Sequence, residues 1–418
     1  TDAGGLATIG AVGSGTAGNV TITNSQAGVT FSSTVDAGIL SITDTADSQD
    51  VTFAGDVNAV TLTTTANAYD LIFQEDVTVT NDVTFAAIRN LDIGDGPDVA
   101  TFNGGLDTQA ATGTVTVAGT IQTSGDRMDI GAVTLAADTT LDTGNAAAGI
   151  LNVGGVTSGT NALTLDSGST GGATIGLTSF ADATGGLTIR DAGGLATIGA
   201  VGSGASGDVT ITNSQAGVTF SSTVNAGTLL LTDTTGTVTA QGDLVAATLT
   251  TANAGYNVQF DEDVTITNDV SFLNTGAVTL GSANDDVMLF GGGINTAGAG
   301  TNPSGTTLAG ILRTSADQVD LGAVTLGANS VIDSTNNGGS GVGAAINIAS
   351  VDADDAGSND RTLTLNSGTG GAIAVSGAIG STQALAGLDV TNSNGAAFSG
   401  AVTVNDGSGV LDVSDTED

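Results

Sequence analysis

Aspartates grouped around glycines are the residues of this sequence best suited to bind a ligand. The longest group is DADDAGSND at positions 352–360. Its alternating acids and central glycine are typical of calcium loops, although the distal glutamate of an EF-hand is missing. Aspartate also forms turns without any ligand, by hydrogen bonding to nearby backbone. The group therefore predicts either turns or a calcium site whose ligands are Asp352, Asp354, Asp355 and Asp360.

A second, shorter group has the same character. Asp92, Asp95 and Asp98 are evenly spaced around Gly94 and Gly96. Carboxylate oxygens at this spacing could also bind calcium, and again turn formation is the alternative. The GGxGxD repeat of calcium-binding β-rolls is absent from the chain. We expect that the protein requires no cofactor and that calcium is the ion these carboxylates could take.

Carboxylate pairs raise a second chemical hypothesis, the hydrolysis of polysaccharides. A glycosidase needs two carboxylates flanking the scissile bond, and Glu75-Asp76 and Glu262-Asp263 are adjacent acids. Each pair occurs once in a long internal repeat, so repetition of the scaffold explains them without an active site. Histidine and lysine are absent, which removes two common bases. We predict that the protein is not an enzyme, and a polysaccharide-active enzyme is an alternative.

Threonines recur at alternate positions in successive segments. If the intervening apolar residue points inward, these threonines point outward and form a stacked T-x-T row. Such rows resemble the ice-binding face of antifreeze solenoids, whereas threonine also suits exposed strand positions for reasons unrelated to a ligand. An ice-binding module is therefore a further alternative. The row consists of Thr21/Thr23, Ser41/Thr43 and Thr61/Thr63.

Apolar rows between Asn19 and Val79 indicate the scaffold that must position these polar residues. Apolar and polar residues alternate inside each row, as in a β-strand. Like residues at a fixed interval indicate stacked turns of a solenoid. The sequence predicts an all-β fold, a parallel β-helix with coils of about 20 residues and right-handed crossovers. The rows are Ile22, Ile42 and Leu62; Phe31, Phe53 and Phe73; Val35, Val57 and Val77.

A longer repeat contains these coils. The segment DAGGLATIGAVGSG begins at Asp2 and again at Asp191. In the second copy Ile211, Leu231 and Leu249 continue the first apolar row, and Phe220 and Phe260 continue the second, with the middle Phe replaced near Val238. We predict one continuous solenoid with long repeats at 1–189 and 190–387 and the start of a degenerate third at 388–418.

Composition narrows the possible partners. Among 418 residues there are 65 glycines, 43 acidic residues and 5 arginines, and the net charge is −38. Nucleic-acid binding needs a basic surface, and anionic membranes repel an acidic one. No apolar run approaches the roughly 18 residues of a membrane span. We therefore expect neither nucleic-acid binding nor membrane insertion.

Short phrases repeated along the chain carry a resemblance to a known class. Gly131-Ala-Val-Thr-Leu135, Gly322-Ala-Val-Thr-Leu326, Asp50-Val-Thr-Phe53 and Phe290-Gly-Gly-Gly293 are examples. They resemble the repeats of large bacterial surface proteins, the filamentous-haemagglutinin-like and autotransporter-like β-solenoids. The resemblance covers nearly the whole chain, but the secretion domain of those families is not visible. It implies an exported protein located outside the cell or on its surface.

The expected function is structural. The chain starts inside a repeat and its tail after Val413 has no apolar cap, so strand edges would be free to pair with further copies. We expect a segment of a cell-surface fibre, sheath or surface layer that assembles head to tail or laterally into a homo-polymer, with cations screening the acidic surfaces. The main alternative is the stalk of a large adhesin that does not self-assemble. Other cell-surface components or glycans are further possible partners.

Overall fold

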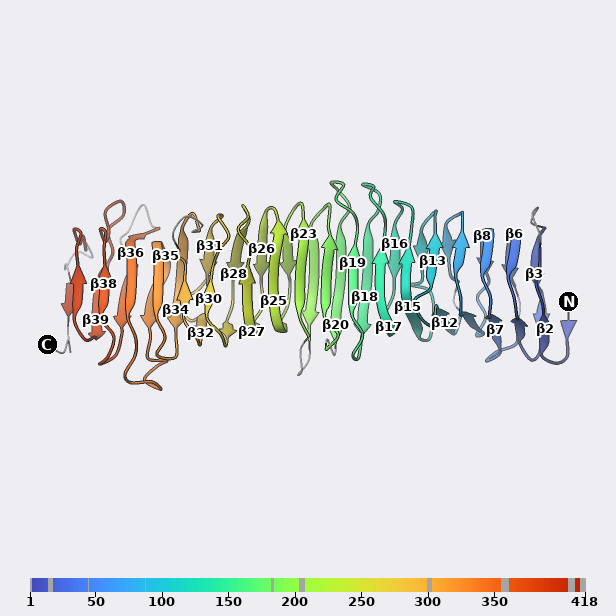
Figure 1. The fold of residues 1–418 in the computed structure, drawn as a ribbon, viewed down its shortest axis with the longest axis horizontal. Coiled ribbons are helices and arrows are strands. Elements are labelled where there is room, and N and C mark those ends of the chain that lie inside the picture. The colour runs from blue at the N-terminus through green and yellow to red at the C-terminus, as the bar shows by residue number, and fades with distance from the viewer. Residues whose placement is uncertain are drawn as a thin grey trace. The chain divides into compact units, whose positions relative to one another are not determined.

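Parallel strands make up the fold. The computed structural model describes residues 2–13, 18–43, 45–86, 88–181, 184–202, 207–298, 303–354, 361–404 and 410–413. The chain divides into two compact units, Thr1–Ala216 and Gly217–Asp418. The regular elements of the described ranges are all strands, and no helix occurs there. Within each unit the strands stack side by side (Figure 1), so the predicted all-β parallel β-solenoid is confirmed.

The strands of the first unit are short and follow one another through tight corners. Their bounds are β1 Asp2–Ala3, β2 Ala7–Ile9, β3 Val20–Ile22, β4 Asn24–Ser25, β5 Val29–Phe31, β6 Val35–Ile42, β7 Asp50–Phe53, β8 Val57–Thr64, β9 Asp70–Phe73, β10 Val77–Val79, β11 Val83–Thr84, β12 Asn90–Ile93, β13 Val99–Phe102, β14 Leu106–Asp107, β15 Val115–Gln122, β16 Met128–Ile130, β17 Val133–Asp142, β18 Leu151–Thr157, β19 Leu163–Asp166, β20 Ile175–Ala181, β21 Leu187–Asp191, β22 Ala196–Val201 and β23 Val209–Ser214.

The second unit is built in the same way. Its strands are β24 Val218–Phe220, β25 Val224–Thr234, β26 Thr237–Ala240, β27 Leu244–Thr251, β28 Asn257–Phe260, β29 Val264–Ile266, β30 Val270–Ser271, β31 Val278–Leu280, β32 Val287–Phe290, β33 Ile294–Asn295, β34 Thr306–Arg313, β35 Val319–Asp333, β36 Ile346–Ala353, β37 Thr362–Asn366, β38 Ile373–Val375, β39 Gly387–Asn392, β40 Ala396–Phe398 and β41 Val410–Val413.

Each turn of the first unit contains three strand segments. In one turn the first segment is β5, and β6 supplies the second and third segments on either side of Gly38. First, second and third segments of successive turns stack into what we call face 1, face 2 and face 3. In-register partners are about 22 residues apart, as for Val29 and Val51, slightly more than the sequence predicts. The predicted right-handed sense stays a prediction.

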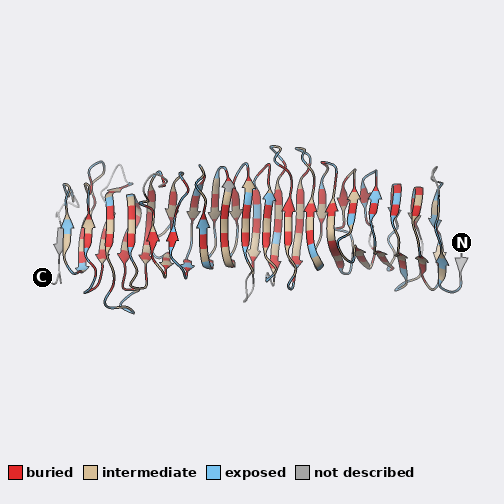
Figure 2. Cartoon of the chain, viewed as in Figure 1, coloured by how far each residue is buried: buried red, intermediate tan, exposed pale blue. Residues whose placement is uncertain are grey.

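The aromatic row predicted from the sequence is confirmed. Phe31 pairs in register with Phe53, and Phe53 with Phe73. All three side chains are fully buried, since inward and outward residues alternate along β5, β7 and β9. In Figure 2 buried positions likewise alternate along the strands with intermediate or exposed ones. The corner row Val35, Val57 and Val77 is likewise in register. These stacked side chains form the core of the unit.

The predicted row of Ile22, Ile42 and Leu62 is wrong at its last step. Ile22 does pair with Ile42, but Ile42 pairs with Thr64 and Leu40 pairs with Leu62. The reason is that Val35 and Ile42 lie on one strand, so the offset that brings Val35 to Val57 applies to the whole strand. Two rows on one strand cannot keep different offsets unless a bulge intervenes.

The second unit shows the same correction. Leu229, rather than Leu231, pairs with Leu249, and Leu231 pairs with Thr251. The position between Phe220 and Phe260 is occupied by Ala240, and its neighbour Val238 pairs with the valines on either side. The predicted replacement of the middle Phe near Val238 is therefore confirmed, and the residue in its place is Ala240.

Equivalent segments of the long repeat lie on different faces. Ala7–Ile9 pairs with β5 on face 1. Its near-identical counterpart Ala196–Ile198 pairs with Ile175–Leu177, which continues face 3 through the start of β18 and β16. Because the separation of Ala7 from Ala196 is not a whole number of turns of about 22 residues, the copy is displaced by one segment. The division at 1–189, 190–387 and 388–418 stays a prediction from the sequence.

Candidate functional surfaces

The first predicted calcium group is only partly within the described residues. Asp352, on β36, accepts hydrogen bonds at Oδ1 from the backbone N–H groups of Thr382 (2.8 Å) and Gln383 (3.3 Å). Asp354 accepts one from Arg361 Nε at 2.8 Å. Asp355 and Asp360 lie outside the described residues. Asp352 thus binds the segment about 30 residues further along the chain, and Asp354 pairs with nearby Arg361. Calcium binding here stays a prediction.

The second group divides between a strand and a corner. Asp98 Oδ2 accepts the N–H groups of Asp95 (3.0 Å) and Gly96 (3.2 Å), which closes the corner after β12. Asp92 lies on β12 itself, in register with Thr116. Burial raises the pKa of Asp92 above its usual value, and the hydroxyl of Thr116 opposes that shift. Among the described residues no three acidic side chains are grouped so that they could hold a metal ion.

The paired acids also act at corners. Asp76 Oδ1 accepts the N–H of Val99 on the next turn at 2.8 Å. Its counterpart Asp263 accepts the N–H of Val287 at 2.7 Å. Glu75 and the equivalent Glu262 are exposed. In each pair the aspartate therefore links two successive turns by a hydrogen bond, and the glutamate faces solvent.

The aromatic residues of the described ranges are buried, except Phe398, which is half-buried. The tyrosines Tyr69 and Tyr256 occupy equivalent positions, and each has 0% of its surface exposed. The exposed large hydrophobic residues of the described ranges are aliphatic, with Val60 and Val245 about half exposed. Sugar-binding sites commonly offer a flat aromatic ring to the ligand, and these tyrosines cannot do so.

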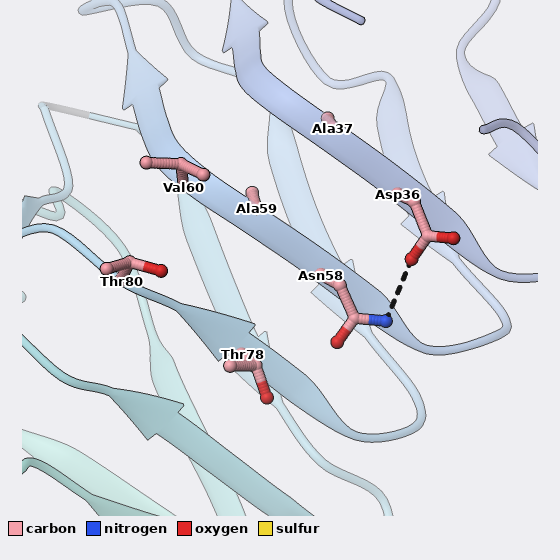
Figure 3. A pocket seen from close by; sticks show the side chains of 7 residues that line it. All are labelled: Asp36, Ala37, Asn58, Ala59, Val60, Thr78 and Thr80. Atoms are coloured by element: carbon pink, nitrogen blue, oxygen red, sulfur yellow. Dashed lines mark hydrogen bonds between the residues drawn. The ribbon is translucent and has the colours of Figure 1, made fainter. Parts of the chain in front are cut away.

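A shallow groove lies on face 2 of the first unit (Figure 3). Asp36, Asn58 and Thr78 are in-register outward residues of β6, β8 and β10, and Asn58 Nδ2 donates to Asp36 Oδ1 at 3.1 Å. Ala59 and Val60 complete an apolar side. The groove has a volume of about 340 Å³ and is open to solvent. It presents one amide, one carboxylate and two hydroxyls, those of Thr78 and Thr80.

A second groove of about 450 Å³ is acidic. Its charged lining consists of four aspartates and one arginine, and Arg127 Nε donates to Asp129 Oδ2 at 2.6 Å. Asn152 Nδ2 donates to the other oxygen of Asp129 at 2.8 Å. The remaining carboxylates would repel an anionic ligand. The four aspartates are Asp82, Asp107, Asp126 and Asp129.

The outward threonines form columns, but not the predicted T-x-T row. Thr21 pairs with Ser41, which pairs with Thr63 in place of Thr61. Thr210, the counterpart of Thr21, lies on face 2 instead of face 3 because of the displacement of the long repeat. The longest column that the register shows is on face 2, one threonine wide: Thr120, Thr140, Thr164, Thr188 and Thr210.

Next to this column is a row of carboxylates that sequence reasoning missed. Asp142, Asp166 and Asp191 are register partners at the ends of β17, β19 and β21. We call these three residues the aspartate ladder. The signal was present in the phrases TTLD, LTLD and LTIRD, where an aspartate follows the inward residue. The third phrase has one residue more than the other two, and a bulge in the pairing accommodates it. The equivalence of the three aspartates is therefore not evident from the sequence.

Asp166 is the central and most buried member of the ladder. Its carboxylate accepts the N–H of Gly168 (2.8 Å) at Oδ1 and Arg190 Nη1 (3.2 Å) at Oδ2. Burial raises the pKa of Asp166 above its usual value; the Gly168 N–H lowers it, and the charges of Asp142 and Asp191 raise it further. The net direction is upward, so Arg190 does not compensate for burial and the two neighbouring acids.

Comparisons with known proteins give no relative. No protein-family model, no curated protein and no solved structure matches this chain. The described residues include no helix long and apolar enough to cross a membrane. The geometry of the chain is therefore the basis for a functional proposal.

Proposed function

We propose that this chain is a structural extracellular protein, a β-solenoid segment of a cell-surface fibre, sheath or surface layer. Copies of the chain associate end to end and side by side, and cations screen their acidic surfaces. The parallel β-solenoid is compatible with such a role because each turn presents a strand to the next. The resemblance to large bacterial surface repeats supports the proposed extracellular location.

The observation that carries the proposal is the use of corner carboxylates to hold turns together. Asp76, Asp138 and Asp263 each accept a backbone N–H from the following turn, at 2.7–2.8 Å. These three carboxylates are thus committed to the scaffold. Together with the stacked core, these turn-to-turn hydrogen bonds favour a structural role, in which the protein serves as a stable repeat scaffold.

Assembly is tested with the purified full chain at two ionic strengths. At about 0.01 M salt, where the Debye length is about 30 Å, repulsion between chains of net charge −38 keeps them apart. At about 0.15 M salt, or with added calcium, the Debye length of about 8 Å or less permits contact. We expect sedimentation and negative-stain images to show larger assemblies in the second condition. Single chains under every condition would contradict self-assembly.

The calcium hypothesis is tested separately by calorimetry. A saturable heat on titrating calcium into the full chain, lost in Asp352→Asn and retained in Asp92→Asn, would assign an ion to the first acidic group. The opposite pattern would assign it to the second. Absence of saturable heat would leave cations with a screening role only, which the assembly proposal already includes.

The net charge favours a second candidate, an adhesin stalk that does not self-assemble. A chain with 43 acidic and 5 basic residues repels its own copies at every surface that carries this excess. The stalk predicts single particles at both ionic strengths, with and without calcium. The sedimentation experiment therefore separates the two candidates directly.

A further inference from the structure

The aspartate ladder places three carboxylates on consecutive turns of the first unit. Asp142 pairs in register with Asp166, and Asp166 with Asp191. Neighbouring parallel strands are about 4.8 Å apart, so each carboxylate has another within the distance at which like charges repel strongly near a protein surface. Asp166, in the middle, retains only 7% of its surface exposed.

The groups around Asp166 do not neutralise the ladder. From β17 it faces Asp142, which is bound to the N–H of Gly144 at 2.7 Å. From β21 it faces Arg190 and Asp191. Asp191 accepts a hydrogen bond from Asn213 Nδ2 at 2.6 Å. Three carboxylates therefore share one arginine, whose side chain is 44% exposed.

The second unit contains the same column with one carboxylate. Asp333 pairs with Asn366, and Asn366 with Asn392. Arg313 pairs with Asp333 from the preceding turn. The phrase Leu363-Thr-Leu365 repeats Leu163-Thr-Leu165, so Asn366 is the counterpart of Asp166. Amides at two of the three positions show that the column folds without the extra acids.

We propose that the aspartate ladder is a pH-sensitive element of the first unit, in which uptake of a proton by Asp166 tightens the packing of β17, β19 and β21. Above the pKa of Asp166 the three charges push these turns apart, and the turns open more often. After protonation Asp166 becomes a hydrogen-bond donor between two carboxylates. The column of the second unit lacks this response because Asn366 is neutral at every pH.

The sign of the effect follows from the direction of the pKa shift. A carboxyl whose pKa is raised on folding binds its proton more tightly in the folded state. The stability that the proton gives is fully present below the unfolded value of about 3.9. It is lost as pH rises through the raised pKa of folded Asp166. Acid therefore stabilises this part of the unit locally.

The test measures amide hydrogen exchange, corrected for intrinsic rates, in the full chain at about pH 4 and pH 7. In Asp166→Asn the amides of β17, β19 and β21 exchange more slowly than in the unaltered chain at pH 7, and the difference shrinks at pH 4. Each unit of pKa shift corresponds to a tenfold change in the opening equilibrium. If the two proteins differed equally in exchange rate at pH 4 and pH 7, or did not differ at pH 7, the proposal would be overturned.

Two further variants make the result independent of one substitution. Asn366→Asp places a second acid beside Asp333 and should give β35, β37 and β39 the pH dependence that they lack. Arg190→Gln removes the one cation beside Asp166 and should extend the acid stabilisation to higher pH. If Asn366→Asp leaves exchange in these strands independent of pH, stacked carboxylates are not the cause and the proposal fails.

Discussion

Phe31 and Phe53 lie face to face on adjacent turns of the first unit, with ring centroids 4.8 Å apart and planes 6° from parallel. Phe73 continues the stack, 5.2 Å from Phe53. The distance between the Phe31 and Phe53 rings equals that between neighbouring strands. The rings therefore stack in contact without distorting the backbone. In the second unit the middle position of the equivalent column is Ala240.

Removing the middle ring should open a cavity in the first unit. Phe53→Ala deletes a fully buried side chain between two aromatic neighbours, and the typical cost of such a change is about 3–5 kcal/mol. The opening free energy of β7 and β9, measured by hydrogen exchange, should fall by this amount. A loss below about 1 kcal/mol would mean that the neighbouring turns collapse into the space.

The reverse change in the second unit is the matched control. Ala240 is already buried, in register between Phe220 and Phe260, which are buried too. Ala240→Phe should therefore overpack this column and destabilise it, by about 1–3 kcal/mol. Stabilisation would instead show that the column contains an unfilled space.

The two buried tyrosines should respond differently to loss of the hydroxyl. Tyr256 Oη accepts the N–H of Ala252 (3.0 Å) and donates to the carbonyl of Leu231 (3.3 Å). The Tyr69 hydroxyl, near Thr64, forms no hydrogen bond of good geometry. Tyr256→Phe should cost about 1–2 kcal/mol and Tyr69→Phe close to nothing. Local hydrogen exchange around each tyrosine measures both; equal costs would contradict the difference in bonding.

The absorbance of these tyrosines gives an independent measurement. Burial raises the pKa of Tyr256 to about 12, against the hydrogen bonds that lower it. The pKa of Tyr69 is raised too, again mainly by burial. In alkaline titration neither phenol should ionise near pH 10 while the fold persists. An ionisation near pH 10 would show that water reaches the rings.

Glycine is required where one turn approaches the next. A Cβ at Gly104 would lie 2.3 Å from the backbone nitrogen of Asp82, and one at its counterpart Gly292 would lie 2.4 Å from that of Asp269. Gly104→Ala should destabilise the first unit by at least about 2 kcal/mol. Gly96→Ala is the control, since a Cβ there meets nothing within 4 Å. Equal thermal stability of the two variants would contradict the close approach.

Asp129 should lose its stabilising effect in acid, the opposite of Asp166. Burial raises the pKa of Asp129, but hydrogen bonds from Arg127 and Asn152 outweigh it and hold the pKa below its usual value. Its contribution is present above about pH 3.9 and is lost as pH falls through the lowered pKa. Asp129→Asn should cost about 0.5–1 kcal/mol at pH 7, because Arg127 is largely exposed.

Its counterpart Asp320 provides the control for that measurement. Asp320 accepts hydrogen bonds from Gln318 Nε2 (2.8 and 2.9 Å) and Asn347 Nδ2 (2.7 Å), both neutral groups. Asp320→Asn should therefore destabilise the second unit less than Asp129→Asn destabilises the first, since Asp129 also gains the Coulomb attraction of the Arg127 cation. Hydrogen exchange of β16 and β35 at pH 7 compares the two.

The stacked core was predictable from the sequence alone. Phe31, Phe53 and Phe73 return at nearly equal intervals, and such spacing has few explanations other than turns lying over one another. The alternation of apolar and polar residues inside each segment predicted the strands, since successive side chains of a strand point to opposite faces. Fold class and the aromatic row depend only on these local periods.

Only the tertiary structure decided which residues share a column. Ile42 lies beside Thr64 because the whole of β6 keeps one offset, which a row read in isolation does not reveal. The face on which a segment lies depends on the summed length of every preceding corner, so near-identical segments at Ala7 and Ala196 lie on different faces. For the same reason the aspartate ladder, whose members Asp142, Asp166 and Asp191 are unequally spaced in the sequence, emerged only from the register.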